Sequence, residues 1–463
     1  MIMSPPLLLR LLACASVASA AAASPSTSHS SAAHAVRKSP QRIAYTSLSS
    51  IYDGNDLLLD ALTTDGYASI TDIMSNDGRR FREMKHDLMS NLHACMMDIG
   101  DDVPMQHLDD GTVRKSFATT SLPSDNEKKA LQQPIHILDE FLASNPQKSS
   151  VCHAFQEHLT EFRTTVGEAT RLFAARLSVE LGVSLPRPLL LSSNDESGNN
   201  YDDVESVVMG GEQLEHFHSY QKDNEKEGDD DATTIRLHTD QGLFIAFTPG
   251  MVLDHSSKQS LELSNGFYVL DSTTGEIVLL EFTEDDDLVF MLGDSVNHII
   301  NAQLGDADRK KVLRATPHAL SLSTEQPRVW YGRMVLPPND AYLPEAPTTT
   351  FGQIRQALVE PSSKGESIPI GIGCSSNSKA VINLSRSLSS DGGHGVDANL
   401  CADDEMFCWF RCMALTEETA TCGERNLGLQ CVDPRGLVVE DGKGHGDYFP
   451  GKDIQKKFVT YVD

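Results

Sequence analysis

A run of short strand-like segments fills much of the second half of the chain and limits the folds open to it. Six segments, separated by acidic or glycine-containing turns, follow one another at 234–247, 266–271, 276–282, 287–292, 311–322 and 327–335. Several short strands in series are typical of an antiparallel sandwich or barrel, in which two sheets cover a common core. We therefore expect this half to form such a core.

Helical patterns precede these strands. Apolar residues at helical spacing predict a long helix over 151–181, which ends at Gly182, and a second helix over 79–97. A short helix over 56–62 and a strand over 66–70 are expected before them. The predicted fold class is therefore α+β, with a helical N-terminal scaffold joined to the β core.

Charge and length exclude several classes of protein. The chain has 463 residues, and 66 Asp and Glu against 38 Lys and Arg give a net charge of −28. Nucleic acids and anionic membranes reward positive surfaces, so we expect no nucleic-acid partner. No segment after the N-terminus approaches the roughly 18 apolar residues that a membrane-spanning helix needs, so no transmembrane segment is expected.

The N-terminal residues indicate targeting. Residues 1–23 combine a short apolar run with small residues suited to signal peptidase, which predicts a cleaved signal peptide and a secreted or secretory-lumen protein. Residues 24–44 contain basic and small residues but no acidic ones, which favours a disordered leader. The same composition also fits an organellar presequence that follows the signal, so an organelle is the alternative location.

Nine cysteines are unevenly distributed. After a linker rich in Pro, Ser, Gly and Thr over 339–400, five of them fall between Cys401 and Cys431 without the CxxC pairs of zinc sites. This pattern predicts a small disulfide-rich module over 401–463, which offers a surface for a binding partner. Cys95 and Cys152 have no nucleophilic motif around them, so we expect each to be disulfide-bonded or buried.

One motif carries the chemistry. In Leu237-His238-Thr239-Asp240-Gln241-Gly242, the side chains of His238 and Asp240 would face the same side of a strand. A non-haem Fe(II) site of the facial-triad type needs one further imidazole. His298 and His318 both compete for that role. Arg328 follows His318 by ten residues, and an arginine fork beside an iron site could anchor a dicarboxylate cosubstrate.

These motifs together resemble the isopenicillin N synthase-like family of Fe(II)/2-oxoglutarate dioxygenases. The matching residues are His238-Thr239-Asp240-Gln241-Gly242, Gly293-Asp294, His318 and Arg328-Val329-Trp330, and the similarity extends over roughly 45–338. The resemblance implies a helical region at 45–200 and a double-stranded β-helix (jelly-roll) at 201–338. It also implies that His238, Asp240 and His318 bind iron, that Arg328 binds the C5 carboxylate of 2-oxoglutarate and that Tyr220 assists cosubstrate binding.

The function implied is the O2-dependent oxidation of a small-molecule or peptide substrate, with succinate and CO2 as co-products. Two features depart from the family. Trp330 stands where a serine hydroxyl would share the cosubstrate carboxylate, and Ala302–Lys311 is expected to form an inserted loop at the site mouth. Alternatives are a secreted binding or adhesion protein with a non-catalytic oxygenase-like fold, and an iron oxidase that does not use 2-oxoglutarate.

Overall fold

A computed structural model describes the main body of the chain. The described residues are 36–49, 56–74, 78–108, 110–122, 131–145, 149–193, 200–222, 233–253, 261–264, 266–322, 326–343, 346–353, 413–414 and 429–430. The predicted signal peptide, and nearly all of the predicted cysteine-rich module and its linker, lie outside them. Among the described residues, no helix is both long and apolar enough to cross a bilayer.

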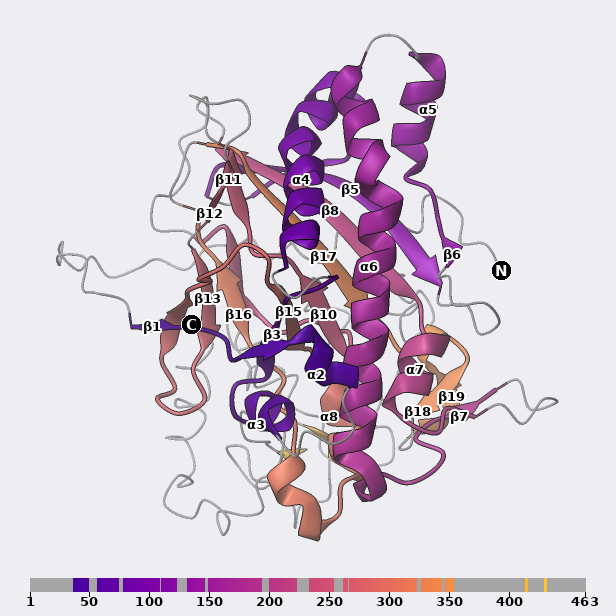
Figure 1. Cartoon of the computed structure of the whole chain (residues 1–463). Helices are drawn as coiled ribbons and strands as arrows, with labels where there is room; N and C mark the ends of the chain where they lie inside the picture. The colour runs from indigo at the N-terminus through magenta and orange to yellow at the C-terminus, as the bar shows by residue number, and fades with distance from the viewer. Residues whose placement is uncertain are drawn as a thin grey trace.

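Two sheets form the β part of the protein (Figure 1). The smaller has the strand order β1 (Arg37–Lys38), β14 (Ile277–Leu280), β13 (Phe267–Leu270), β16 (His318–Leu320) and β9 (Ile235–His238). The larger has the order β2 (Arg42–Ala44), β3 (Tyr67–Thr71), β15 (Leu288–Leu292), β10 (Phe244–Phe247), β17 (Arg328–Val335), β8 (Gln213–Lys222), β5 (Thr112–Leu122) and β4 (Met105–His107). Attached to it are β11 (Met251–Leu253), β12 (Leu261–Leu263) and β6 (Leu131–Gln132).

Helices cover the outer face of the large sheet. In Figure 1, α4 (Arg79–Ile99) and α6 (Ser150–Leu181) run side by side in front of that sheet, with α5 (His136–Ser144) beside one end of α6. The remaining elements are short: α2 (Tyr45–Ser49), α3 (Leu57–Thr64), α7 (Val204–Gly210), α8 (Ser295–Ile299), four 3-10 turns at 100–102, 182–184, 301–303 and 306–311, and the strands β7 (Leu191–Ser192), β18 (Ala341–Leu343), β19 (Ala346–Thr350), β20 (Met413–Ala414) and β21 (Leu429–Gln430).

The alternation of side chains on the large sheet separates two cores. On β10, Phe244 and Ala246 pack in the core that contains the helices, whereas Ile245 and Phe247 pack in a second core. That second core also contains Phe267 and Val269 from the small sheet, so it lies between the sheets. Because neighbouring side chains on a strand point to opposite faces, the large sheet is the middle of three layers. The sequence prediction of a mixed α+β fold is confirmed.

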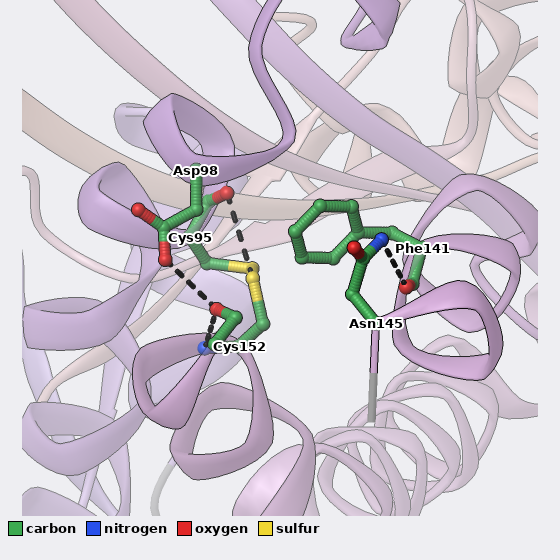
Figure 2. The surroundings of a disulfide bond; sticks show 6 residues. Cys95, Asp98, Phe141, Asn145 and Cys152 are labelled. Atoms are coloured by element: carbon green, nitrogen blue, oxygen red, sulfur yellow. Dashed lines mark hydrogen bonds between the residues drawn. A yellow bond between two sulfur atoms is a disulfide. The ribbon is translucent and has the colours of Figure 1, made fainter. Parts of the chain in front are cut away.

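A disulfide joins the two principal helices. Cys95 of α4 and Cys152 of α6 are both fully buried, and their sulfur atoms are 2.03 Å apart (Figure 2). Beside it, Ser149 caps α6 by accepting a hydrogen bond from the Cys152 backbone N–H, and its own hydroxyl donates to Asp98 of α4. The same helix pair stacks Phe81 on Phe162 with ring centroids 5.7 Å apart. These contacts fix α4 against α6.

The long-helix predictions are confirmed, since 151–181 and 79–97 correspond to α6 and α4. Two strand predictions are corrected. The segment 234–247 is interrupted between β9 and β10, where the chain turns at Gln241-Gly242, and most of 311–322 is irregular apart from β16. The strands β5 and β8 carry polar and charged residues on both faces and were not predicted.

Two boundary predictions also need correction within the described residues. Residues 36–44 are not disordered, because β1 pairs with β14 and β2 with β3, and Lys38 forms ion pairs of 2.5 Å with both Asp65 and Asp271. At the other end, the start of the predicted linker is structured. There β18 pairs with β7 and β19, and Phe351 is buried in the core.

Candidate metal centre

His238, Asp240 and His318 form a cluster that could hold a metal ion. Their ligand atoms all lie within 4.8 Å of one another. The carboxylate of Asp240 lies between the two rings, with one oxygen 3.7 Å from His238 Nε2 and the other 3.8 Å from His318 Nε2. Two imidazoles and one carboxylate are the facial set that binds non-haem Fe(II) and leaves further coordination positions open.

Strand pairing brings the two histidines together across 80 residues of sequence. His238 ends β9 and His318 begins β16, and these residues are direct partners in the antiparallel ladder. Their ring centroids are 4.4 Å apart. Asp240 lies beyond the end of β9, so its side chain reaches the cluster from the turn and not from a continuous strand as the sequence suggested.

The Gly293-Asp294 turn holds the segment that carries Asp240. The backbone N–H of Asp294 donates to the Asp240 carbonyl at 2.7 Å, and the N–H of Gly293 donates to the Leu243 carbonyl at 3.0 Å. A Cβ at position 293 would lie 2.3 Å from the Gly242 carbonyl oxygen and 2.7 Å from that of Asp240. This close backbone approach requires glycine at position 293, which gives the Gly-Asp motif a positioning role.

The surroundings of His318 fix its chemical form. Its Nδ1 lies 3.1 Å from the Thr316 carbonyl oxygen, which can only accept, so Nδ1 carries the proton and the Nε2 lone pair faces the cluster. Its ring stacks on Phe267 at 5.4 Å. Burial, followed by the nearby His238, lowers the pKa of His318 to about 4, which keeps the imidazole neutral and able to bind a metal.

The alternative histidine lies outside this cluster. His298 is on α8, one helical turn from Asp294, and its Nε2 is 3.6 Å from that carboxylate. Its ring nitrogens do not belong to the cluster formed by His238, Asp240 and His318. Of the two histidines that the sequence left open, the structure therefore brings only His318 to His238 and Asp240.

Arg328 and Tyr220 are direct partners on neighbouring strands of the large sheet. The Cζ of Arg328 lies 5.9 Å from the centroid of the Tyr220 ring, and both residues are 3% exposed. A Cβ at position 250 would lie 2.1 Å from the guanidinium, so Gly250 makes room for it. Burial lowers the pKa of Arg328 to about 10, opposed only by Tyr220. Among the described residues, no acidic side chain pairs with this guanidinium.

Trp330 lies on the same side of β17 as Arg328, as predicted. Its indole stacks on His218 with ring centroids 5.3 Å apart and planes 3° from parallel, and it lies 6.1 Å from the Phe247 ring. The hydroxyl near Arg328 comes instead from Ser264, whose Oγ accepts a hydrogen bond of 2.9 Å from Arg328 Nε. Sequence reasoning missed Ser264 because it follows β12, outside every motif.

The predicted insert is placed against the helices. Lys311 donates to the carbonyl oxygens of Glu180 and Leu181 at the C-terminal end of α6, at 3.0 and 3.3 Å. Asp308 accepts a hydrogen bond from Ser184, just beyond that helix. Basic side chains satisfy the carbonyls at a helix C-terminus, so Ala302–Lys311 caps α6, and these contacts give no support to a loop at the site mouth.

No protein-family model matches the chain, and no curated protein matches it. Among solved structures it is similar to Arabidopsis thaliana dioxygenase for auxin oxidation 1 bound to 2-oxoglutarate, with 11% identity over 65% of this chain and 93% of that one and a TM-score of 0.42. It is also similar to the rice dioxygenase for auxin oxidation, with 15% identity over 65% of this chain and 84% of that one and a TM-score of 0.41. A third similar structure is JOX2 in complex with 2OG, Fe and JA, with 12% identity over 71% of this chain and 87% of that one and a TM-score of 0.43. At these identities and TM-scores, the resemblance assigns neither a family nor a substrate to this chain.

Proposed function

We propose that the protein is an Fe(II)/2-oxoglutarate-dependent dioxygenase whose β core is a double-stranded β-helix. The strand order supports the fold assignment. We assign eight strands to this core. Four of them, β8, β10, β15 and β17, lie in the large sheet, and the other four, β9, β13, β14 and β16, lie in the small one. The chain therefore passes repeatedly between two facing sheets, as it does in a jelly roll.

The donor set supports the choice of metal. His238 and His318 offer neutral nitrogen ligands, and Asp240 offers one negative oxygen. This combination suits Fe(II) better than the thiolate or all-oxygen sets that favour other metals. The Thr316 carbonyl that orients His318 is the kind of supporting hydrogen bond that metal-binding histidines usually make.

The buried Arg328 is the observation that carries the proposal for the cosubstrate. A guanidinium removed from water without an acidic partner costs several kcal/mol, so its burial indicates a missing anion. Its fork matches a carboxylate with two parallel hydrogen bonds. Ser264 and Tyr220 flank it and supply the polar surroundings that Trp330 does not. We assign Arg328, assisted by Tyr220, to the C5 carboxylate of 2-oxoglutarate.

Fe(II) with 2-oxoglutarate and O2 would supply the oxidising chemistry, with succinate and CO2 as co-products. The chain's own residues would bind and orient. Asp240 contributes one negative charge, the two imidazoles stay neutral, and Arg328 holds the far carboxylate. Phe247, Phe267 and Trp330 line the core between the sheets and limit the access of water.

The other readings of the sequence explain less of this arrangement. A non-catalytic binding protein has no need of the His238–Asp240–His318 donor set, and an oxidase independent of 2-oxoglutarate would use the buried Arg328 only if its substrate carried an anion. For location, we propose the secretory lumen or the cell exterior, with an organelle as the alternative. The Cys95–Cys152 disulfide supports an oxidising compartment.

Anaerobic titration tests the proposal. We expect the protein to bind one Fe(II) and then, on addition of 2-oxoglutarate, to develop a metal-to-ligand charge-transfer band in the visible. Iron binding without the band would instead support an oxidase that does not use 2-oxoglutarate. Absence of iron binding would overturn both and leave the binding-protein reading.

A further inference from the structure

A second buried arginine lies in line with the first. On adjacent strands of the large sheet, Arg114 of β5 pairs with Tyr220 of β8, which pairs with Arg328 of β17. The next residues along each strand that face the same side are Ser116, His218 and Trp330, which also form a row. The residues between these rows, such as Phe117 and Phe217, belong to the core beneath the helices. Arg114 therefore belongs to the face directed at the metal cluster.

Arg114 is buried without a counter-charge. It is 6% exposed, one of its terminal nitrogens donates to Gln106 at 2.5 Å, and its Nε is fully buried with no hydrogen-bond partner. No acidic side chain within the described part of the chain forms an ion pair with it. A guanidinium has five N–H donors, and leaving one of them buried and unsatisfied costs free energy. Like Arg328, it is arranged for an anion.

The two arginines are held on opposite sides of Tyr220. Arg328 is fixed by Ser264 beyond β12, whereas Arg114 is fixed by Gln106 on β4. Since neighbouring strands lie about 4.8 Å apart, the two backbones are separated by roughly 9.6 Å with the tyrosine strand between them. Two forks held by different neighbours on either side of one strand suit two anions better than one.

Imidazole and aromatic side chains share the face of the large sheet that carries Arg114. His216 lies on the same face of β8, and burial lowers its pKa to about 4, with the charge of Arg114 acting in the same sense and that of Asp240 in the opposite one. His216 therefore lies close enough to Arg114 and to Asp240 for both charges to act on its pKa. Along the same face, His218 stacks on Trp330, Trp330 contacts Phe247, and Phe247 contacts Phe267, the ring that stacks on His318.

We propose that Arg114 binds a carboxylate of the primary substrate, and that this substrate is a carboxylic acid with an apolar or aromatic body that extends toward the metal cluster. This inference rests on the proposed function, because only a dioxygenase that uses 2-oxoglutarate has a separate primary substrate. The anion site itself stands on the burial of Arg114 and on its separation from Arg328.

Binding measurements on the Fe(II)- and 2-oxoglutarate-loaded protein, kept anaerobic, test this assignment. The probe is 3-phenylpropanoate, with the uncharged 3-phenylpropanamide as its control, titrated by calorimetry. We expect the acid to bind the wild type and Arg114→Gln to weaken it about 10- to 100-fold, the loss expected for a charge-assisted hydrogen bond. Arg114→Lys, which keeps the charge but not the fork, should lose less. Arg80→Gln, at an exposed arginine of α4, should change nothing.

The affinity for 2-oxoglutarate separates the two arginines. Arg328→Gln should abolish the charge-transfer titration, whereas Arg114→Gln should leave its midpoint within about threefold of wild type. An equal loss of 2-oxoglutarate affinity in both variants would place Arg114 in the cosubstrate site and overturn the proposal. The proposal would also be overturned if the acid and the amide bound equally well, or if the acid did not bind the wild type. If the wild type shows no charge-transfer band but binds the acid through Arg114, the proposed function fails while the anion site stands.

Thermal unfolding of the metal-free protein distinguishes a binding residue from a structural one. Because Arg114 is buried with no acidic partner among the described residues, it is a cost in the free protein, and Arg114→Gln should raise the melting temperature or leave it unchanged. A marked fall would mean that Arg114 stabilises the fold, which contradicts its assignment as a ligand-binding residue.

Discussion

At the scale of single residues, the proposed site contains polar groups whose binding capacity the rest of the fold does not use. His318 is held neutral with one nitrogen directed at Asp240, and Arg328 is buried with no acidic side chain paired to it in the described part of the chain. A fold that only needed stability would pair or replace such groups, because a buried unpaired charge is destabilising. His318 belongs to the small sheet and Arg328 to the large one, on the sides that face each other, and we propose that they bind a cation and an anion together.

The choice between the two candidate histidines is testable by substitution. His318→Ala should abolish Fe(II) binding, because it removes one of the three donors that lie within 4.8 Å of one another. His298→Ala should retain binding, since that ring pairs with Asp294 outside the cluster. Metal content after anaerobic loading measures both. Loss of iron in the His298 variant with retention in the His318 variant would reverse the assignment.

At the scale of elements, the metal cluster depends on a turn that supplies no ligand. The segment from Asp240 to Leu243 is held by backbone hydrogen bonds from 293–295, directly after β15. The segment that carries the Asp240 carboxylate is therefore positioned by residues that follow a strand of the other sheet. Elements on the far side of the large sheet, such as the α4–α6 pair, should affect stability more than metal binding.

Gly293→Ala should weaken Fe(II) binding by tenfold or more (about 1.4 kcal/mol or more). The added methyl group would approach the carbonyl oxygens of Gly242 and Asp240 to 2.3 and 2.7 Å and would displace the turn that carries the ligand. The matched control is Gly305→Ala, because a Cβ there meets nothing within 4 Å. Calorimetric titration of both variants with Fe(II) measures the difference. Equal affinities would show that the turn does not position Asp240.

The disulfide between α4 and α6 should act on stability alone. Replacing Cys95 and Cys152 with alanine should lower the free energy of unfolding by about 2–4 kcal/mol, since the closed loop restricts the unfolded chain. Urea unfolding measures the loss, and Fe(II) affinity in native conditions should stay within about threefold of wild type. A variant as stable as the wild type would show that helix packing alone is sufficient.

At the scale of the whole molecule, local patterns were readable from the sequence and long-range ones were not. The amphipathic stripe of α6 and the His238-x-Asp240 motif are short-range signals. The first predicted α6 correctly, and the two side chains of the second lie close together as expected, whereas their role as metal ligands stays a prediction. Ser264 follows β12, outside every motif. The ladder that aligns Arg114 with Arg328 depends on strands β5 and β8, whose polar residues hide their period. Their pairing partners lie about 100 residues away, so no spacing in the sequence reveals them.

The buried charges of the molecule predict acid lability. Burial lowers the pKa of His216 to about 4, and the buried Glu215, between Arg163 and Arg333, has its pKa lowered to about 2. Desolvation opposes that second shift, but the two guanidiniums prevail. In both cases the unfolded chain binds protons more readily than the folded one, so stability rises with pH.

Stability of the metal-free protein should therefore fall as pH drops from about 6.5 toward 4 through His216, together with His218 and His318, whose pKa values burial also lowers. It should fall again from about 4.5 toward 2 through Glu215. Urea unfolding at a series of pH values measures this. His216→Phe should make the upper part of the curve shallower by the share of this one histidine and leave the lower part unchanged. A stability that is constant between pH 7 and 4 would contradict the neutral, buried state of this histidine.

We propose that this chain turns over 2-oxoglutarate at the His238–Asp240–His318 cluster. The most direct measurement is O2-dependent formation of succinate by the Fe(II)-loaded protein, compared with Asp240→Ala and Arg328→Gln. We predict that the wild type forms succinate, slowly without its substrate and faster with it, and that both variants form at least about 100-fold less. Wild-type protein that holds iron and 2-oxoglutarate yet forms no more succinate than Asp240→Ala would contradict the account.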